Sequence, residues 1–123
     1  MKYLCLIFLD EQKLEVLSKS EAEALTDETS AYDEALRQSG HLLVAQPLKS
    51  AQTATTLRVR NGKLSITDGP FAETKEMLAG FYLVEARDLD EAIKLAAKIP
   101  PAEVGSIEVR PIRPIRESPR RGE

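Results

Sequence analysis

Two periods of hydrophobic and polar positions alternate along the chain and predict strands and helices in turn. Residues 2–9 are almost continuously apolar, which is typical of a strand that is covered on both faces. Residues 10–17 show no clear period and are interpreted as a connection. A shorter apolar run at 41–45 predicts a second strand, which Pro47 ends, and a polar loop follows as far as Ala54.

The segment that begins at Ser20 has the 3.6-residue period of an amphipathic helix. Ser20 and Glu23 have the spacing of a capping box, which satisfies free backbone N–H groups of the first turn. Gly40 is expected just past the end, because glycine adopts the left-handed conformation without a Cβ clash. One face carries a mostly apolar stripe and the other carries carboxylates. The stripe is Ala22, Leu25, Thr29, Tyr32 and Leu36, and the acidic face is Glu21, Glu23, Asp27, Glu28, Asp33 and Glu34.

Residues 57–66 have the two-residue period of a β-hairpin. Asn61-Gly62 is a preferred dipeptide of the type I′ turn. A two-residue loop pairs Val59 with Leu64 and Leu57 with Ile66, so that these four apolar side chains share one face. The turn and the alternation therefore predict the same register.

Two more strands and a second helix complete the pattern. Residues 80–86 are largely apolar, and residues 106–112 alternate with Ile107 and Val109 inward. Between them Asp88 and Glu91 begin a helix, and the prolines at 100 and 101 end it. Its buried side is expected to consist of Leu89, Ala92, Ile93, Ala96 and Ala97.

The order β-α-β, hairpin, β-α-β predicts an α+β fold, a ferredoxin-like split βαβ with an inserted β-hairpin and both helices on one face of an antiparallel sheet. The strands at 2–9 and 80–86 are apolar on both sides, yet two helices cover one face only. Because an apolar sheet face is unstable in water, we expect a second copy to cover it, as a two-fold homodimer. The concave space between helices, hairpin and loops is the predicted place for a small-molecule ligand.

Composition and charge narrow the class of protein. The 123 residues suit one domain, placed at residues 1–115, with a flexible C-terminal tail at 116–123. The net charge is −3 and basic residues gather only towards that tail, so we expect neither a nucleic acid nor a membrane partner, with DNA binding by the tail as the alternative. The basic residues in question are Arg110, Arg113, Arg116, Arg120 and Arg121.

The numbers of cysteines and histidines indicate the redox compartment and the capacity to bind a metal. Cys5 is the only cysteine, which rules out an internal disulfide and fits a reducing, cytoplasmic compartment. Its apolar neighbours predict a buried, inert thiol. A single histidine and no cysteine pair make poor metal ligands, and we expect no metal and no cofactor.

Candidate chemistry concentrates in the segment TDGPFAETKE at 67–76. Asp68 is a candidate general acid or base, with an Asx-turn as the structural alternative. Lys75 and Thr74 are candidate anchors for a polar or anionic substrate, and a solvated charged loop is the alternative. Phe71 either lines a pocket or packs on the core.

Two candidates lie outside this segment. A histidine side chain can act as an acid or a base near neutral pH, so His41 is a candidate acid–base partner of Asp68, although an exposed histidine at the start of a strand is unremarkable. Tyr82 follows the charged segment on the next strand and is the tyrosine best placed to line a pocket. The alternative for Tyr82 is a core side chain with its hydroxyl at the rim.

Several of these segments together resemble one family. The run DGPFAETKE at 68–76, followed by LAGFYLVE at 78–85, is similar to the hallmark of the DGPF-type proteins within the YCII-related family. The segments at 2–4, 40–48, 54–62 and 105–112 are similar too, so the resemblance covers nearly the whole chain. It implies a dimeric α+β barrel.

The resemblance also implies two functional hypotheses. Some YCII-related proteins resemble metal-free enzymes with a His–Asp pair in a pocket, but the histidine of that pattern lies on the first helix, near where Thr29 stands here. The first hypothesis is a small-molecule enzyme in which Asp68 and His41 perform acid–base chemistry and Lys75 anchors the substrate. Bacterial DGPF-type proteins are also associated with extracytoplasmic-function sigma factors, so the alternative is a non-catalytic ligand-binding or regulatory module that acts with such a factor.

Overall fold

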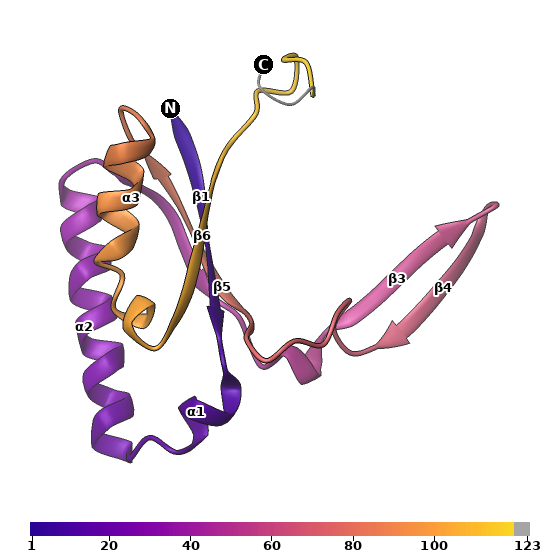
Figure 1. Ribbon diagram of the computed structural model, residues 1–123, viewed down its shortest axis with the longest axis horizontal. Coiled ribbons are helices and arrows are strands. Elements are labelled where there is room, and N and C mark those ends of the chain that lie inside the picture. Colours follow the sequence, from indigo (N-terminus) through magenta and orange to yellow (C-terminus); the bar gives the residue numbers. More distant parts are fainter. Residues whose placement is uncertain (120–123) are drawn as a thin grey trace.

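One antiparallel sheet and a separate hairpin organise the computed structural model, which describes residues 1–119. The sheet has the strand order β2-β5-β1-β6, from β2 (Leu42–Pro47), β5 (Met77–Glu85), β1 (Lys2–Leu9) and β6 (Gly105–Pro111). Figure 1 shows α2 (Lys19–Gln38) and α3 (Leu89–Ala97) together on one side of this sheet. The predicted α+β, ferredoxin-like fold with an inserted hairpin is confirmed. The residues of the predicted tail from 120 to 123 lie outside the described part of the chain.

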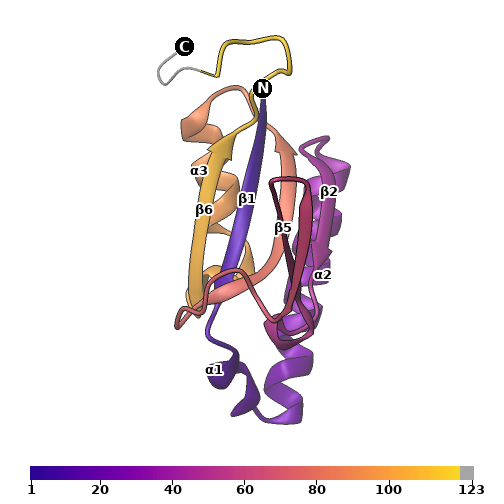
Figure 2. The ribbon, with the colours of Figure 1, turned by 90° about the vertical axis from the view of Figure 1, so that its right-hand side faces the viewer.

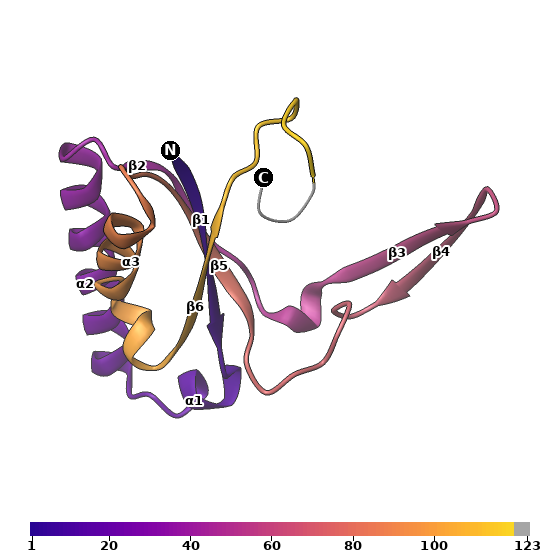
Figure 3. The ribbon, with the colours of Figure 1, turned by 45° about the horizontal axis from the view of Figure 1, so that its top comes forward.

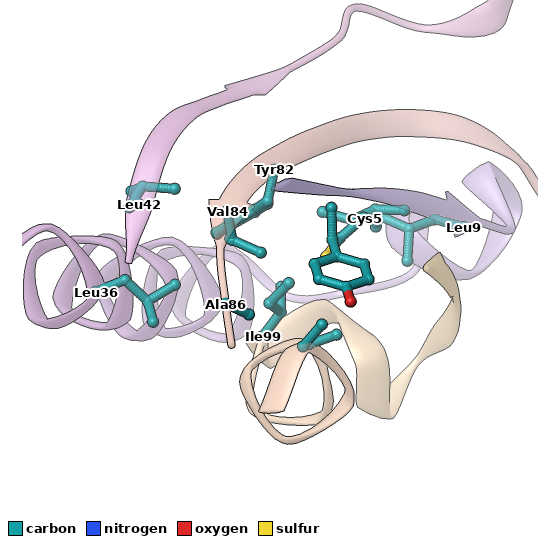
Figure 4. Close-up of a cluster of buried hydrophobic side chains, with 12 residues drawn as sticks. Cys5, Leu9, Leu36, Leu42, Tyr82, Val84, Ala86 and Ile99 are labelled. Atoms are coloured by element: carbon teal, nitrogen blue, oxygen red, sulfur yellow. The ribbon is translucent and has the colours of Figure 1, made fainter. Parts of the chain in front are cut away.

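The core fills the layer between the helices and the sheet. Alternate residues of β1 from Tyr3 to Leu9 are buried there, and Cys5 has no exposed surface. Val84 of β5 and Ile99, which follows α3, are each 1% exposed. Figure 4 shows these side chains converging from strands and helices. Burial raises the pKa of the Cys5 thiol to about 11, as expected for an inert core cysteine.

The opposite face of the sheet is apolar and lacks a helical cover. Its centre is formed by half-buried side chains of the two central strands, β1 and β5. Within residues 1–119 no α-helix covers this face, which faces the viewer in Figure 2, and only the short 3₁₀ helix Ala51–Thr53 lies on that side, at the base of the hairpin. We call this surface the bare face, and its central side chains are Leu4, Leu6, Phe8, Phe81 and Leu83.

The predicted hairpin is confirmed in its register and turn. In β3 (Thr55–Arg60) and β4 (Lys63–Asp68), Leu57 pairs with Ile66 and Val59 with Leu64. The turn residues Asn61 and Gly62 have φ values of 52° and 74°, as a type I′ turn requires. Figures 1 and 3 show the hairpin projecting away from the sheet on the side opposite the helices. We call residues 55–68 the arm.

The helix starts differ from the sequence prediction at the N-terminal end. The capping box is formed by Ser18 and Glu21, not by Ser20 and Glu23: Glu21 N donates to Ser18 Oγ at 3.1 Å, and Ser18 N donates to Glu21 Oε1 at 3.0 Å. The sequence repeats the same spacing two residues apart, so the motif alone did not fix the start. Gly40, with φ of 81°, follows the helix end as predicted.

Two further predictions about helices were wrong. The presumed connection at 10–17 contains a short helix, α1 (Glu11–Glu15), capped by the Asp10 carboxylate, and five residues are too few to reveal a period. On α3 the start at Asp88 is confirmed, but Leu89 and Ile93 are each 48% exposed. Of the predicted buried side, Ala92 and Ala96 are confirmed, because small side chains let the helix approach the sheet closely. Ala97 is exposed as well.

We expect Gly105→Ala to destabilise the fold, against the usual stabilising trend of Gly→Ala at ordinary backbone positions. A Cβ at Gly105 would lie 2.2 Å from the Phe8 backbone oxygen and 2.5 Å from Leu9 Cδ2, so β6 would be pushed off β1. Overpacking of this kind costs about 1–3 kcal/mol. Urea unfolding measures it, with Glu108→Ala, exposed on the same strand, as the control. Equal stability of the two variants would refute the steric argument.

Candidate functional site

A cavity of about 380 Å³ lies between α2 and the helix-covered face of the sheet. This is within the size range of small-molecule sites. Its walls are largely apolar and come from β1, α1, α2, β2 and β5, with Ile7, Leu14, Leu25, Ala45 and Ala79 among them. Its polar lining includes Thr26, Thr29, Ser30, Asp33, Gln46 and Tyr82. We call it the α2 pocket.

The central polar feature of the α2 pocket is a tyrosine–carboxylate pair. The Tyr82 hydroxyl of β5 donates a hydrogen bond to Asp33 Oδ1 of α2, across 49 residues of sequence. Tyr82 is only 4% exposed. Burial is the main cause that raises the pKa of Tyr82, and the hydrogen bond to Asp33 adds to it. Tyr82 therefore stays a neutral donor at physiological pH and orients the carboxylate.

The α2 side of the pocket presents one carboxylate and three hydroxyl groups. Thr26, Thr29, Ser30 and Asp33 follow one another along one side of the helix at spacings of one to three residues. The Thr29 hydroxyl donates to the Leu25 carbonyl at 2.7 Å, so its oxygen is left to accept. An ionised carboxylate accepts several hydrogen bonds, and Tyr82 uses one. The pocket thus suits a ligand with apolar surface and hydroxyl donors.

Of the predicted site residues, Tyr82 lines the α2 pocket and Asp68 does not. Asp68 is the exposed last residue of β4, at the base of the arm. The next residue, Gly69, has φ of 104°, and its N–H donates to the Ala54 carbonyl at 2.7 Å. The DGP sequence therefore shapes the return from the arm to the sheet. The catalytic role of Asp68 stays a prediction.

His41 lies at the other end of β2 from the arm. It follows the Gly40 turn, and its Nε2 is 3.6 Å from Glu91 Oε1. Its Nδ1 is 2.7 Å from Ser39 Oγ. The length of β2 separates it from Asp68, so the fold does not bring the two predicted acid–base partners together. These contacts describe a junction between α2, β2 and α3.

The remaining predicted residues lie in the loop at 69–76, which we call the signature loop, away from Tyr82. Lys75 and Thr74 line a separate cavity of about 460 Å³, beside Glu11 of α1. Phe71 is 78% exposed, with the Arg58 guanidinium 5.4 Å from its ring centroid, so core packing of Phe71 was the wrong alternative. Their substrate-binding roles stay predictions.

Asp33 was missed because it had been assigned to the solvated acidic face of the helix. A signal was present: Asp33 lies four residues after Thr29 and three before Leu36, at the edge of the apolar stripe. A carboxylate at that edge lies at the rim of the surface on which the apolar stripe packs. Which strand residue it meets cannot be inferred from helix periodicity.

Residues 1–119 contain neither a metal-binding cluster nor a helix that could cross a membrane. No group of three or more His, Cys, Asp or Glu side chains is arranged to hold a metal ion in this range. The helices of the same range are all too short or too polar to cross a bilayer.

The chain is similar to a protein family, to a protein of known sequence and to a solved structure. The family of the YCII-related domain matches residues 1–116. An uncharacterized protein of Rhizobium meliloti (strain 1021) is 40% identical over 114 residues, covering 91% of this chain and 92% of its own. The structure of 5-chloro-2-hydroxyhydroquinone dehydrochlorinase (TftG) from Burkholderia phenoliruptrix AC1100, in complex with 2,5-dihydroxybenzoquinone, superposes with a TM-score of 0.54 at 20% identity, over 92% of this chain and 94% of that one. The family match runs over nearly the whole sequence, and the chain belongs to the YCII-related domain family.

Proposed function

We propose that this protein is a metal-free small-molecule enzyme that performs acid–base chemistry in the α2 pocket, with Asp33 as the proton acceptor and Tyr82 as its orienting donor. The observation that carries this proposal is the Tyr82–Asp33 hydrogen bond in the wall of an otherwise apolar cavity of about 380 Å³. A hydrogen-bonded polar pair in the wall of an apolar cavity is a candidate for catalysis. If these two side chains served only for packing, a pair of apolar side chains would fill the same space. The dehydrochlorinase with the same fold supports an enzymatic role.

The substrate class that fits is a small hydroxylated ring. Apolar side chains such as Ile7 and Leu25 offer contact for ring faces, and Asp33 and Thr29 offer acceptors for hydroxyl groups. In the proposed step Asp33 accepts the proton of a ring hydroxyl, and the electron pair of the broken O–H bond moves into the ring. Tyr82 keeps its proton: its hydroxyl donates to the Asp33 carboxylate before the transfer and to the carbonyl oxygen of the Asp33 carboxylic acid after it.

We further propose a subgroup and a cellular location for this chain. The segment 68–76 supports membership of the DGPF-type subgroup, and the lone buried thiol supports a cytoplasmic location. The alternative site is the signature loop with Asp68, Lys75, Thr74 and Phe71, and His41 is a further candidate that lies apart from them at the other end of β2. The alternative function is a regulatory module acting with a sigma factor. Copurification of a sigma factor, with no turnover affected by Asp33, would favour that alternative.

We also propose that the working form is a homodimer in which two bare faces pack together and complete an α+β barrel. The bare face supports this, because five large apolar side chains at its centre remain partly exposed in one chain. The α2 pocket lies on the other side of the sheet and stays open in such a dimer.

A thermal-shift screen of hydroxylated ring compounds tests the pocket. We include 2,5-dihydroxybenzoquinone because the structural neighbour binds it. A compound that binds the folded state raises the melting temperature by mass action. We expect Thr29→Phe, which fills the pocket, to abolish the shift, and Ala31→Phe, exposed on the same helix, to preserve it. Shifts that survive Thr29→Phe would place binding elsewhere and refute the proposal.

A further inference from the structure

The arm exposes an apolar face that its own chain leaves uncovered. Leu57, Val59, Leu64 and Ile66 share that face by register and are 56–62% exposed. The other face carries Arg58, Arg60 and Lys63 with hydroxyl side chains. A two-stranded hairpin alone is at best marginally stable in water, so an arm of this kind needs support along its length.

The base of the arm is fixed to the body. Gly69 N donates to the Ala54 carbonyl, and Thr56 Oγ1 donates to the Gly69 carbonyl at 2.9 Å. The Arg58 guanidinium stacks over Phe71 of the signature loop. These contacts tie β3 to the return loop, and the arm is held out from the sheet on the bare-face side (Figures 1 and 3).

We propose that the arm packs against a second copy of this chain. The apolar face of the arm contacts that copy, and the basic face of the arm stays in water. The inference rests on the homodimer of the proposed function and adds a second contact to it. Whatever covers the bare face also lies alongside the arm, because the arm projects on that same side.

The length of the arm matches the depth of a second copy. Each arm strand has six residues, which at about 3.3 Å per residue gives a reach of roughly 20 Å. Packed sheets lie about 10 Å apart, and a helix layer adds about 10 Å more. The arm therefore reaches past the edge of the partner's sheet to its helical layer.

The arm adds apolar contact area to that of the bare face. Four strands spaced about 4.8 Å apart and up to eight or nine residues long make a footprint on the order of 500 Å². A stable interface buries about 800 Å² per partner. In a two-fold dimer each copy contributes one arm, and the two apolar arm faces add to the area that the sheets bury.

The test compares matched pairs of substitutions on the two faces of the arm. Val59→Thr with Ile66→Thr keeps β-branched side chains while placing hydroxyls on the apolar face. Arg60→Thr with Ser65→Thr changes the same number of positions on the basic face and leaves the apolar face intact. Sedimentation equilibrium gives the dimer Kd of each full-length protein, and hydrogen exchange reports the protection of the arm amides.

We expect the apolar-face pair to raise the dimer Kd by a factor on the order of 100, because four altered side chains enter each symmetric dimer. The basic-face pair should change it by less than about threefold. Arm amides should be protected in the wild-type dimer and lose protection in the apolar-face variant. Unchanged Kd values together with unprotected arm amides would overturn the arm proposal and leave the sheet-to-sheet dimer standing. A wild-type monomer at micromolar concentration would overturn both.

Discussion

Leu6→Lys is expected to separate the proposed homodimer into stable monomers. Leu6 lies at the centre of the bare face, on β1 between β5 and β6. In the proposed dimer two lysines would be buried without partners, and an uncompensated buried charge costs about 3–5 kcal/mol. The dimer Kd should therefore rise by a factor on the order of a thousand or more. In a monomer the lysine stem can lie along the apolar face with its charge in water.

Size-exclusion chromatography with light scattering at micromolar concentration measures this change. Ile93→Lys is the matched control, because Ile93 is 48% exposed on the outer side of α3, away from the bare face. The control should remain a dimer, and both variants should keep the wild-type circular dichroism spectrum. If Leu6→Lys also remains a dimer, the two copies do not meet through this face.

Asp33→Asn is expected to reduce turnover of a hydroxylated ring substrate by roughly 10²–10⁴-fold, the usual contribution of a general base. The amide oxygen still accepts the hydrogen bond from Tyr82, so the fold and the pocket shape should persist. What disappears is the basic carboxylate. Asp27→Asn, exposed on the acidic side of the same helix, is the control and should retain full activity.

A pH titration gives this variant a readout that does not depend on substrate. The pKa of Tyr82 is raised above its ordinary value of 10.0 by burial and by Asp33. A raised pKa contributes stability that is fully present below the ordinary value and is lost as pH rises through the folded value. Asp33→Asn should lower the Tyr82 pKa part of the way, since burial remains, and this shift can be followed by tyrosinate absorbance. An unchanged tyrosine titration would show that the pair is not coupled in solution.

The sequence alone was sufficient where structure is specified within a few residues. The register of the hairpin followed from Asn61-Gly62 and the alternation on either side of it. The continuous apolar run of β1 predicted a strand with two apolar faces, and one helical layer covers only one of them. Asp88 at the start of α3 followed from capping chemistry. Such features depend on local periods and turn geometry, which do not require knowledge of the rest of the chain.

The tertiary structure decided everything that depends on how the helices dock on the sheet. Helix periodicity left Asp33 among solvated carboxylates, and only the docking of α2 on β5 brought it to Tyr82. Docking likewise chose Ala92 and Ala96 over Leu89 and Ile93 as the buried side of α3, because close approach favours small side chains. The charged segment at 67–76 lies at the base of the arm, away from that pair, since the hairpin leaves the sheet on the opposite side from the helices. A sequence period defines the face of an element, but the partner of that face is set by packing between elements that are distant in the chain.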